Sequence, residues 1–320
     1  MSTDACVKGL CVVVPCFNEE ESLTPFRDVM KQVEPTLSHW LNIPITYVFV
    51  NDGSTDHTQD ILKRMHEENP NVHYVTFSRN FGKEAALLAG LNKALETKCS
   101  YITVMDADLQ DPPTLLPSMF ERMIDTDCDI VATFRESRDG EPPVRSWFAH
   151  RFYHLLNRIS SVEMRDGARD FRLMQQRVVK SITSMPERER FSKGLFQWVG
   201  FQTEWIGYAN IEREHGKTHW SFWSLFKYAI DGIIAFSILP LEAISVAGLV
   251  LCLIALVALL FIIIRTLVFG DPTSGWPSLV CIIIVLSGLQ LFGIGILGLY
   301  ISKIYSEVKR RPLYIISEEV

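Results

Sequence analysis

Two long apolar runs lie near the end of this chain of 320 residues. Segment 243–264 has no charged residue, and Asp271 is the only charged residue in segment 266–302. A helix needs about 20 apolar residues to cross the roughly 30 Å of hydrocarbon in a bilayer. The pattern therefore predicts two transmembrane helices, over 241–267 and 277–303. A pair of buried helices in a soluble protein is the weaker alternative, because neither run has a polar face.

Basic residues beside these runs indicate their orientation. The second run is followed by Lys303, Lys309, Arg310 and Arg311. The loop between the runs, 268–276, has neither Lys nor Arg. Because cytoplasmic flanks carry the excess of basic residues, we expect both termini in the cytoplasm, with 304–320 as a cytoplasmic tail. No basic segment with an apolar stretch and a cleavage site opens the chain, so no secretory signal is expected.

Segment 216–240, just before the first run, is aromatic and weakly basic. It contains Trp220, Trp223 and Phe226 beside Lys217 and Lys227. This composition suits a juxtamembrane amphipathic helix that lies in the membrane interface. An ordinary amphipathic helix packed on a soluble domain is the alternative.

The first 215 residues show a different pattern, in which short apolar runs alternate with helix-like stretches. The runs are rich in β-branched and aromatic residues and cover 10–15, 46–50, 72–77 and 101–105. Each run is followed by a polar turn. Strand and helix alternating at this spacing predict an α/β domain with a mostly parallel sheet over 1–215. Ligands of such sheets bind outside the carboxyl ends of the strands, so the polar turns are the places to look for chemistry.

Composition and charge narrow the function classes. An apolar fraction of 48% with 21% charged residues indicates a protein that is partly soluble and partly embedded in a membrane. A net charge of −6 provides no cationic field for nucleic acid, so we expect no nucleic-acid partner. The 7 cysteines are scattered without a C-x-x-C pair, which favours reduced thiols over disulfides or a zinc site.

Two carboxylates directly after the fourth run form the first candidate site. Asp106 and Asp108 repel each other unless a cation lies between them. Mg²⁺ or Mn²⁺ is the expected cation, because these ions favour oxygen ligands and use few protein carboxylates together with phosphate oxygens. Asp52, at the end of the second run, is placed to accept hydrogen bonds from a base or ribose. A solvated turn at 106–108 and a turn with a helix cap at 52–54 are the alternatives.

Several longer motifs together carry a family resemblance. In chain order they are VVVPCFNEEESL (12–23), VNDGSTDHT (50–58), SRNFGKEAALLAG (78–90) and VMDADLQDPP (104–113). This set resembles glycosyltransferase family two, whose nucleotide-sugar-binding fold is called GT-A. The later motifs are DFRLM (170–174), RFSKG (190–194), REHGKT (213–218) and KRRPLY (309–314). With the two spans, they are similar to polyprenyl-phosphate glycosyltransferases such as bactoprenol glucosyltransferases and, more distantly, dolichol-phosphate mannose synthase. The similarity covers nearly the whole chain.

The resemblance implies roles for residues in these motifs. Nucleotide-sugar binding is implied for Pro15, Asn18, Glu19, Asp52, Lys83 and Asp106. Metal binding is implied for Asp106 and Asp108 with help from Gln110, and catalysis for Asp170 together with the metal ligand Asp108. Binding of the acceptor phosphate or the donor diphosphate is implied for Arg135, Arg190, Lys193 and Arg213. For each of these basic residues, an ordinary surface charge is the alternative.

One position departs from the family's pattern. Relatives commonly have G-x-S-K-Y after the arginine that corresponds to Arg213, whereas this chain has GKTHW at 216–220. The basic residue there is displaced or replaced by His219, and a Trp-His pair at the membrane interface explains the same residues equally well. His219 therefore receives no role.

The resemblance implies a glycosyltransferase that acts at the cytoplasmic face of the inner or plasma membrane. The expected reaction is inverting, metal-dependent transfer of a hexose or N-acetylhexosamine from a UDP-sugar to polyprenyl (undecaprenyl) phosphate. Alternatives are GDP-mannose transfer of the dolichol-phosphate mannose synthase type and a processive polysaccharide synthase, for which the Q-x-x-R-W motif and further spans are missing. A nucleotide-sensing scaffold and a glycosidase explain less of the sequence. Gly288, Gly293, Gly295 and Gly298 permit close packing, with the first span or in a homo-oligomer.

Overall fold

The structure is a computed structural model, which describes residues 9–37, 40–41, 44–97, 99–136, 165, 167–185, 187–188, 190–209, 239–269 and 275–320. The chain divides into two compact units. Residues 1–229 form the first unit together with 311–320, and residues 230–310 form the second. The first unit contains the sheet, and the second contains two long helices.

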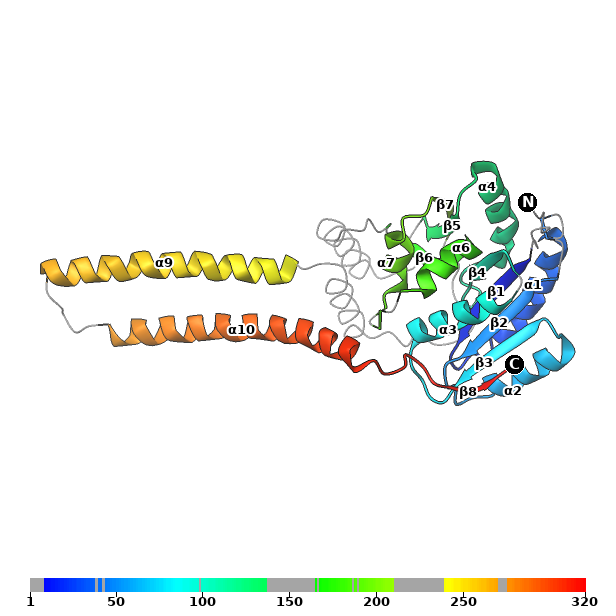
Figure 1. Ribbon diagram of the computed structural model, residues 1–320, viewed down its shortest axis with the longest axis horizontal. Helices are drawn as coiled ribbons and strands as arrows, with labels where there is room; N and C mark the ends of the chain where they lie inside the picture. Colours follow the sequence, from blue (N-terminus) through cyan, green and yellow to red (C-terminus); the bar gives the residue numbers. More distant parts are fainter. Residues whose placement is uncertain are drawn as a thin grey trace, which may run out of the picture. The chain divides into compact units, whose positions relative to one another are not determined.

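Within the described residues, the first unit is built on an eight-stranded sheet in the order β7-β5-β6-β4-β1-β2-β3-β8. Its first four strands in the chain are β1 (Leu10–Cys16), β2 (Thr46–Asn51), β3 (Val72–Phe77) and β4 (Tyr101–Val104). β1 pairs in parallel with β2 and β4, and β2 pairs in parallel with β3. These strands coincide with the four apolar runs, so the predicted α/β fold with a mostly parallel sheet is confirmed (Figure 1).

Later segments of the chain complete the sheet on both sides. They are β5 (Ile130–Arg135), β6 (Ala168–Gln175), β7 (Thr203–Tyr208) and β8 (Ile316–Glu319). β6 runs antiparallel to both β4 and β5, and β7 pairs in parallel with β5. β8 pairs antiparallel with β3. Part of the segment that the sequence indicates only as a tail, 304–320, is thus a strand of this sheet.

Helices cover both faces of the sheet. They are α1 (Leu23–Leu37), α2 (Thr58–Glu68), α3 (Lys83–Glu96), α4 (Leu116–Thr126), α6 (Gln176–Thr183) and α7 (Ser192–Trp198), with a 3-10 turn η1 (Pro113–Leu115). Side chains alternate along β1. Val12 and Val14 join the core shared with α1, α2 and α4, whereas Cys11 and Val13 join the core shared with α3, α6 and α7. Because both faces are apolar and covered, polar side chains gather at the strand ends.

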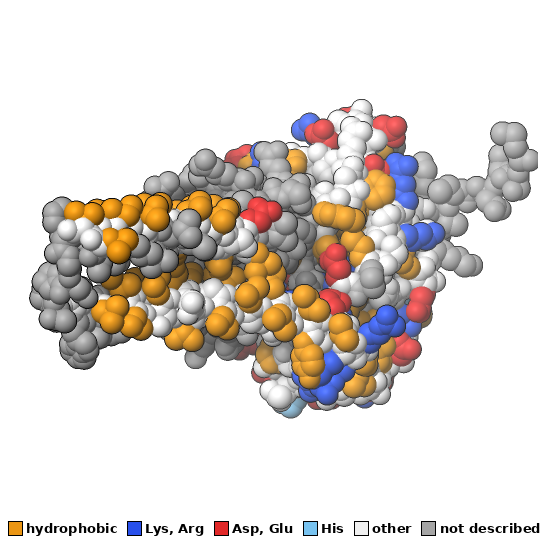
Figure 2. Space-filling model, turned by 60° about the vertical axis from the view of Figure 1, so that its left-hand side comes forward, with side chains coloured by type: hydrophobic (Ala, Val, Ile, Leu, Met, Phe, Trp, Pro, Cys, Tyr) orange, Lys and Arg blue, Asp and Glu red, His pale blue; other side chains and the backbone are white. Residues whose placement is uncertain are grey.

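The second unit contains α9 (Leu239–Phe269) and α10 (Trp276–Lys309), which coincide with the two runs predicted to span a membrane. Figure 2 shows hydrophobic side chains along both helices. Among the described residues, Val285–Lys309 is the one helical segment long and apolar enough to cross a membrane, with a mean hydropathy of 1.8. Only 6% of its apolar window is buried, unlike the core helix of a soluble protein. Crossing by both helices stays a prediction.

Glycines on α10 differ in their surroundings. A Cβ on Gly293 would lie 3.4 Å from Cγ2 of Ile244 on α9, so this glycine packs against the other helix of the same unit. For Gly288, Gly295 and Gly298, no atom of the described residues lies within 4 Å of such a Cβ. Segment 210–238, which includes most of the predicted juxtamembrane helix, lies outside the described residues.

Candidate functional site

The polar turns after β1 and β2 bind to each other at the carboxyl edge of the sheet. Asn18 has a left-handed φ of 55°. Its Oδ1 accepts a hydrogen bond from the Thr55 amide at 2.9 Å, and its amide donates to Ser54 Oγ at 3.0 Å. The Glu19 amide donates to Thr58 Oγ1, at the start of α2, at 2.9 Å. A cavity of about 280 Å³ opens between these turns and is lined by Asn18, Glu19, Glu20, Glu21, Ser22, Thr55 and Asp56.

Asp52 ties the turn after β2 to the turn after β3. It is only 3% exposed, and its carboxylate accepts hydrogen bonds from the Phe81 amide at 2.6 Å and the Gly82 amide at 2.9 Å. Burial raises the pKa of Asp52, and the two amides oppose that rise. Gly53 has a φ of +66°, and a Cβ there would lie 2.4 Å from the carbonyl carbon of Arg79. The close approach of the two turns therefore requires glycine at this position.

Lys83, the first residue of α3, lies between two carboxylates from neighbouring strands. Its Nζ is 2.7 Å from Asp106 Oδ1, just after β4, and 2.8 Å from Asp170 Oδ2 on β6. Burial disfavours the charge on Asp170, but the ammonium groups of Lys83 and Lys193 outweigh it and hold the pKa of this carboxyl well below its usual range. Side-chain exposures of 15% for Asp170, 23% for Asp106 and 44% for Lys83 leave the cluster open to a ligand.

Asp170 has a buried cation next to it on the same face of β6. Arg172 is 1% exposed, and its guanidinium carbon lies 3.7 Å from the ring centroid of Phe196 on α7. Its Nη2 donates to the Arg169 carbonyl at 2.7 Å. Burial lowers the pKa of Arg172 to about 10, although Asp170 opposes the shift. Arg172 therefore stays charged at neutral pH and adds to the positive field on Asp170.

A second charged cluster lies on the opposite face of β6. Asp111 is 1% exposed, and its Oδ1 accepts hydrogen bonds from Arg169 Nε at 2.7 Å and from the Tyr208 hydroxyl. Burial raises the pKa of Asp111, and the Arg169 guanidinium opposes that rise. Gln110 Oε1 accepts hydrogen bonds from Arg135 Nη2 at 3.1 Å and from Arg169 Nη2 at 3.4 Å. In this arrangement the Gln110 oxygen, implied as a metal ligand, faces two guanidinium groups.

Reading the sequence assigns roles to Gln110 and Arg135 of this cluster but none to Asp111 or Arg169. Arg172, on the other face of β6, also receives no role there. A usable signal was present, because residues two apart on a strand share a face. Asp170 and Arg172 therefore belong to one face of β6, and Arg169 belongs to the other.

The remaining basic candidates are placed differently from one another. Arg190 is 8% exposed and donates from Nη1 to the Met185 carbonyl and from Nη2 to the Ile182 carbonyl, each at 3.0 Å. Its guanidinium thus closes the end of α6. Lys193 lies in α7, whose first residue, Ser192, donates from its amide to Glu84 Oε2 at 3.0 Å. This bond joins the starts of α7 and α3. Arg213 and His219 lie outside the described residues.

The acidic pair after β4 fits a divalent cation of the magnesium type. Asp106 and Asp108 offer hard oxygen donors, and the cation beside Asp106 in the structure is the ammonium of Lys83. Within the part of the chain that the structure describes, no group of three His, Cys, Asp or Glu side chains forms a closed metal site. A site that uses one or two carboxylates and completes its ligands with substrate phosphates agrees with both observations.

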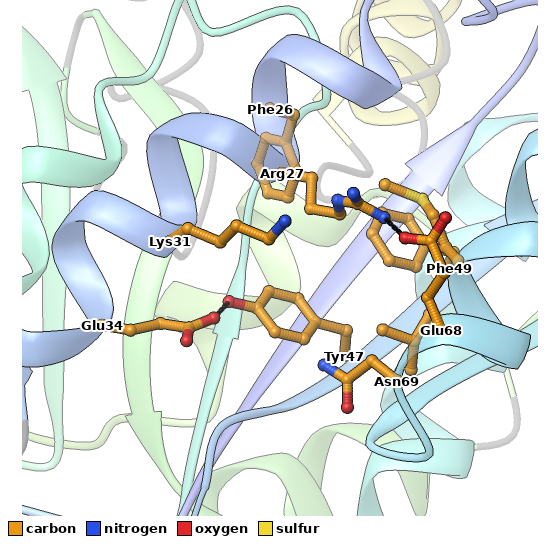
Figure 3. A pocket seen from close by; sticks show the side chains of 10 residues that line it. Phe26, Arg27, Lys31, Glu34, Tyr47, Phe49, Glu68 and Asn69 are labelled. Atoms are coloured by element: carbon orange, nitrogen blue, oxygen red, sulfur yellow. Dashed lines mark hydrogen bonds and ion pairs between the residues drawn. The ribbon is translucent and has the colours of Figure 1, made fainter.

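A second cavity lies at the other end of the sheet. It has a volume of about 260 Å³ and lies between α1 and α2, over the first residues of β2 and β3 (Figure 3). Arg27 forms an ion pair with Glu68, and the Tyr47 hydroxyl donates to Glu34 Oε1 at 2.6 Å. Arg27 and Glu68 are thus paired with each other, and Glu34 is held by a phenol. Because ligands of parallel sheets bind at the carboxyl ends of strands, we assign this cavity no part in the chemistry.

Comparison with known proteins identifies the family. Residues 11–183 match the model of glycosyl transferase family 2. A prophage-derived bactoprenol glucosyl transferase of Shigella flexneri is 40% identical over 309 residues, which is 97% of each chain. An uncharacterized glycosyltransferase of Synechocystis is 38% identical over 310 residues, covering 97% of this chain and 95% of the relative.

A solved mannosyltransferase of Pyrobaculum calidifontis, in complex with GDP-Man and Mn²⁺, is more distant. It is 14% identical, with a TM-score of 0.48, and the similarity covers 94% of this chain and 86% of that one. At this TM-score the similarity carries no argument about the site. The family match and the near full-length relatives are sufficient: the chain belongs to glycosyl transferase family 2 and is a glycosyltransferase.

Proposed function

We propose that this glycosyltransferase moves a hexose or N-acetylhexosamine from a UDP-sugar to polyprenyl phosphate, with inversion at the anomeric carbon. The observation that carries the proposal is the open cluster of Lys83, Asp106 and Asp170 at the carboxyl edge of the sheet. A near full-length relative named bactoprenol glucosyl transferase supports a polyprenyl carrier as acceptor. The UDP donor follows from the resemblance of the chain to that group.

The donor nucleotide is assigned to the turns after β1 and β2. The cavity of about 280 Å³ between these turns is lined by Asn18 and Glu19, and Pro15 lies on β1 directly before them. Asp52 is held by two backbone amides at the inner side of this edge. Asp106 and Asp108 would hold Mg²⁺ or Mn²⁺ on the donor diphosphate, where the ion supplies Lewis-acid stabilisation of the leaving group.

The transfer step needs little base catalysis from the protein. A phosphate monoester has a second pKa near ~6, so a lipid phosphate is mostly ionised at neutral pH. An oxygen of the lipid phosphate attacks the anomeric carbon, the bond to the donor diphosphate breaks, and UDP leaves with the electron pair. Asp170, kept anionic by Lys83, Lys193 and Arg172, acts chiefly to orient the reactants. No covalent intermediate between sugar and protein is required.

Two basic residues are assigned to the acceptor phosphate, Lys193 and Arg213. Lys193 on α7 is close enough to Asp170 to lower the pKa of that carboxyl. We propose that Lys193 binds the acceptor phosphate together with Arg213. Arg135 and Arg190 are proposed to support the site from further away. Arg135 holds Gln110, and Arg190 holds the end of α6 next to α7.

We place the enzyme at the cytoplasmic face of the inner or plasma membrane, with α9 and α10 as its two spans. The segment Val285–Lys309 supports this placement by length and composition. The acceptor phosphate lies at headgroup depth, so tethering lets the enzyme meet its acceptor in two dimensions. A variant in which a flexible linker replaces residues 239–310 keeps β8 and should bind UDP but transfer poorly to long-chain lipid, and transfer at the full-length rate would contradict the role of the spans.

The direct test uses the full-length protein in a membrane fraction with undecaprenyl phosphate and a panel of labelled UDP-sugars together with labelled GDP-mannose. We expect one UDP-sugar to label the lipid, with no covalent labelling of the protein. Labelling from GDP-mannose alone would overturn the UDP assignment. Growth of a long glycan on one carrier would overturn the transfer of a single sugar.

A further inference from the structure

Residues 316–319 form the outer strand of the sheet, beside the strand β3 that leads to the proposed donor site. β8 pairs with β3, and the pairing continues past the strand ends, where the Ser78 amide donates to the Ile315 carbonyl at 2.9 Å. At the other end the Val320 amide donates to the Tyr74 carbonyl at 3.1 Å. Ser78 begins the turn whose later amides bind Asp52. The tail is therefore bonded to the strand that leads directly into the donor site.

A row of aromatic contacts runs from the tail to Asp52. The ring of Tyr314 stacks on Phe77 at the end of β3, with centroids 5.0 Å apart and planes at 11°. Phe77 meets Phe81 edge to face at 5.7 Å. The Phe81 amide donates to Asp52 at 2.6 Å. The hydroxyl of Tyr314 also accepts a hydrogen bond from Asn92 Nδ2 on α3, at 3.2 Å. Because α3 begins at Lys83, Tyr314 contacts two of the elements that lead to site residues, β3 and α3.

Polar contacts form a second row from the tail. Glu318 lies 3.0 Å from Lys63 Nζ and accepts hydrogen bonds from the Tyr74 hydroxyl at 2.8 Å and from Gln59 Nε2 at 3.5 Å. Gln59 Oε1 accepts a hydrogen bond from Asn51 Nδ2 at 2.8 Å. Asn51 Oδ1 in turn accepts one from the amide of Ser54 at 2.9 Å. This row ends at the turn after β2, which binds Asn18.

We propose that Tyr314 is a positioning residue for the donor nucleotide, and that the strand β8, which follows it, holds it in place. Its ring holds Phe77 and Phe81 so that the amides of Phe81 and Gly82 stay aimed at Asp52. The segment after α10 thereby sets donor affinity without contacting the donor. This inference rests on the proposed nucleotide site, and it gives the tail a role that the chain's membership in its family does not assign.

The test uses the full-length protein in detergent and three variants. Tyr314→Ala removes the ring, Tyr314→Phe keeps the ring without the hydroxyl, and Ile315→Ala is the matched control because its side chain on the same segment is 52% exposed. We expect Tyr314→Ala to raise the Kd for UDP and the KM for the UDP-sugar by roughly threefold to tenfold, the range of coupling through packed side chains. Its kcat and its KM for undecaprenyl phosphate should stay near those of the parent. Tyr314→Phe and Ile315→Ala should stay within about twofold of the parent throughout.

Hydrogen exchange at the amides of Phe81 and Gly82 gives an independent readout that needs no donor. Exchange should be faster in Tyr314→Ala than in Ile315→Ala. If Tyr314→Ala does not fold, Tyr314→Leu replaces it, because leucine keeps the apolar bulk. Its Kd for UDP and its amide exchange should change in the same direction as expected for Tyr314→Ala, by a smaller factor. Unchanged UDP affinity together with unchanged exchange in the ring-deleted variant would overturn the inference. A parent protein that binds no UDP would instead overturn the proposed function, while the exchange comparison would still decide whether the tail holds the turn.

Discussion

Two charged clusters lie on opposite faces of β6, and they have opposite characters. On the face of α3, Lys83 joins Asp106 and Asp170 in a cluster that is partly open to solvent. On the other face, Asp111 is 1% exposed and is held by Arg169 and the Tyr208 hydroxyl. Arg169 and Asp170 are adjacent in the chain, so a single strand carries one carboxylate that we propose for the chemistry and one cation that pairs within the scaffold.

The difference between the clusters lies in what remains available to a ligand. Asp111 meets a fixed guanidinium and a phenol in the interior, so its charge is already matched by the protein. Asp106 and Asp170 share one flexible ammonium, and a diphosphate with its metal ion can replace that partner. Substitutions in the open cluster should therefore reduce transfer without unfolding the protein, and substitutions in the closed cluster should do the reverse.

The largest effect is expected in the open cluster. Asp108→Ala or Asp170→Asn should lower transfer to undecaprenyl phosphate by at least about 10²-fold, because each removes a group that holds or orients the reacting phosphates. The protein should stay folded with a lower melting temperature, because Asp108 is 7% exposed and Asp170 balances the charges of Lys83 and the buried Arg172. Measuring labelled lipid and thermal unfolding on the same preparation separates the two effects. Normal turnover would remove that residue from the mechanism.

Arg169→Met should show the reverse pattern. It leaves the buried carboxylate of Asp111 without its cation, and breaking such a pair costs about 3–5 kcal/mol in the free energy of unfolding. Arg122→Ala is the matched control, because its 3.9 Å contact with Glu204 is exposed and such a pair contributes only about 0–1 kcal/mol. Chemical denaturation measures both values. Equal stability of the two variants would contradict the assignment of a scaffold role to the closed cluster.

Arg190→Gln tests a residue that belongs to neither cluster. It removes hydrogen bonds from a charged donor to the Ile182 and Met185 carbonyls, and we expect a loss of about 1–3 kcal/mol in unfolding free energy. The KM for the lipid acceptor should change little. A large rise in that KM with unchanged stability would show that Arg190 binds the acceptor phosphate directly.

The smallest effect is expected from Glu318 on β8, whose ionisation makes the stability of this part of the sheet depend on pH. The hydrogen bonds from Tyr74 and Lys63 lower the pKa of Glu318. A carboxyl with a depressed folded-state pKa stabilises the fold above its ordinary pKa, and this contribution is lost as the pH falls through the folded-state value. The protection factors of β3 amides, which are corrected for the pH dependence of intrinsic exchange, should therefore fall more between pH 6 and pH 3 in the parent than in Glu318→Gln. An equal response in both proteins would exclude Glu318 as the source.

The sequence predicted the features that depend on neighbouring residues, and it did not predict those that depend on contacts between distant segments. The strands β1 to β4 followed from short apolar runs, and the sequence motifs pointed to Asp106 and Asp170 as candidate site residues. The partners of those residues did not follow, because the Lys83 bridge and the Asp111 cluster join segments that are far apart in the chain. Residues 316–319 are an isoleucine followed by three polar residues, so no apolar run predicts them, and pairing with β3 makes them a strand. Tertiary contact decided that element, not propensity.

Metal removal tests the open cluster most directly. The full-length enzyme is incubated with its UDP-sugar and undecaprenyl phosphate, first with excess chelator and then with Mg²⁺ or Mn²⁺ restored. We predict that the chelator stops transfer, that the ion restores it, and that thermal unfolding does not change, because Lys83 already balances Asp106 and Asp170 in the free protein. Transfer at the full rate in excess chelator would contradict the account.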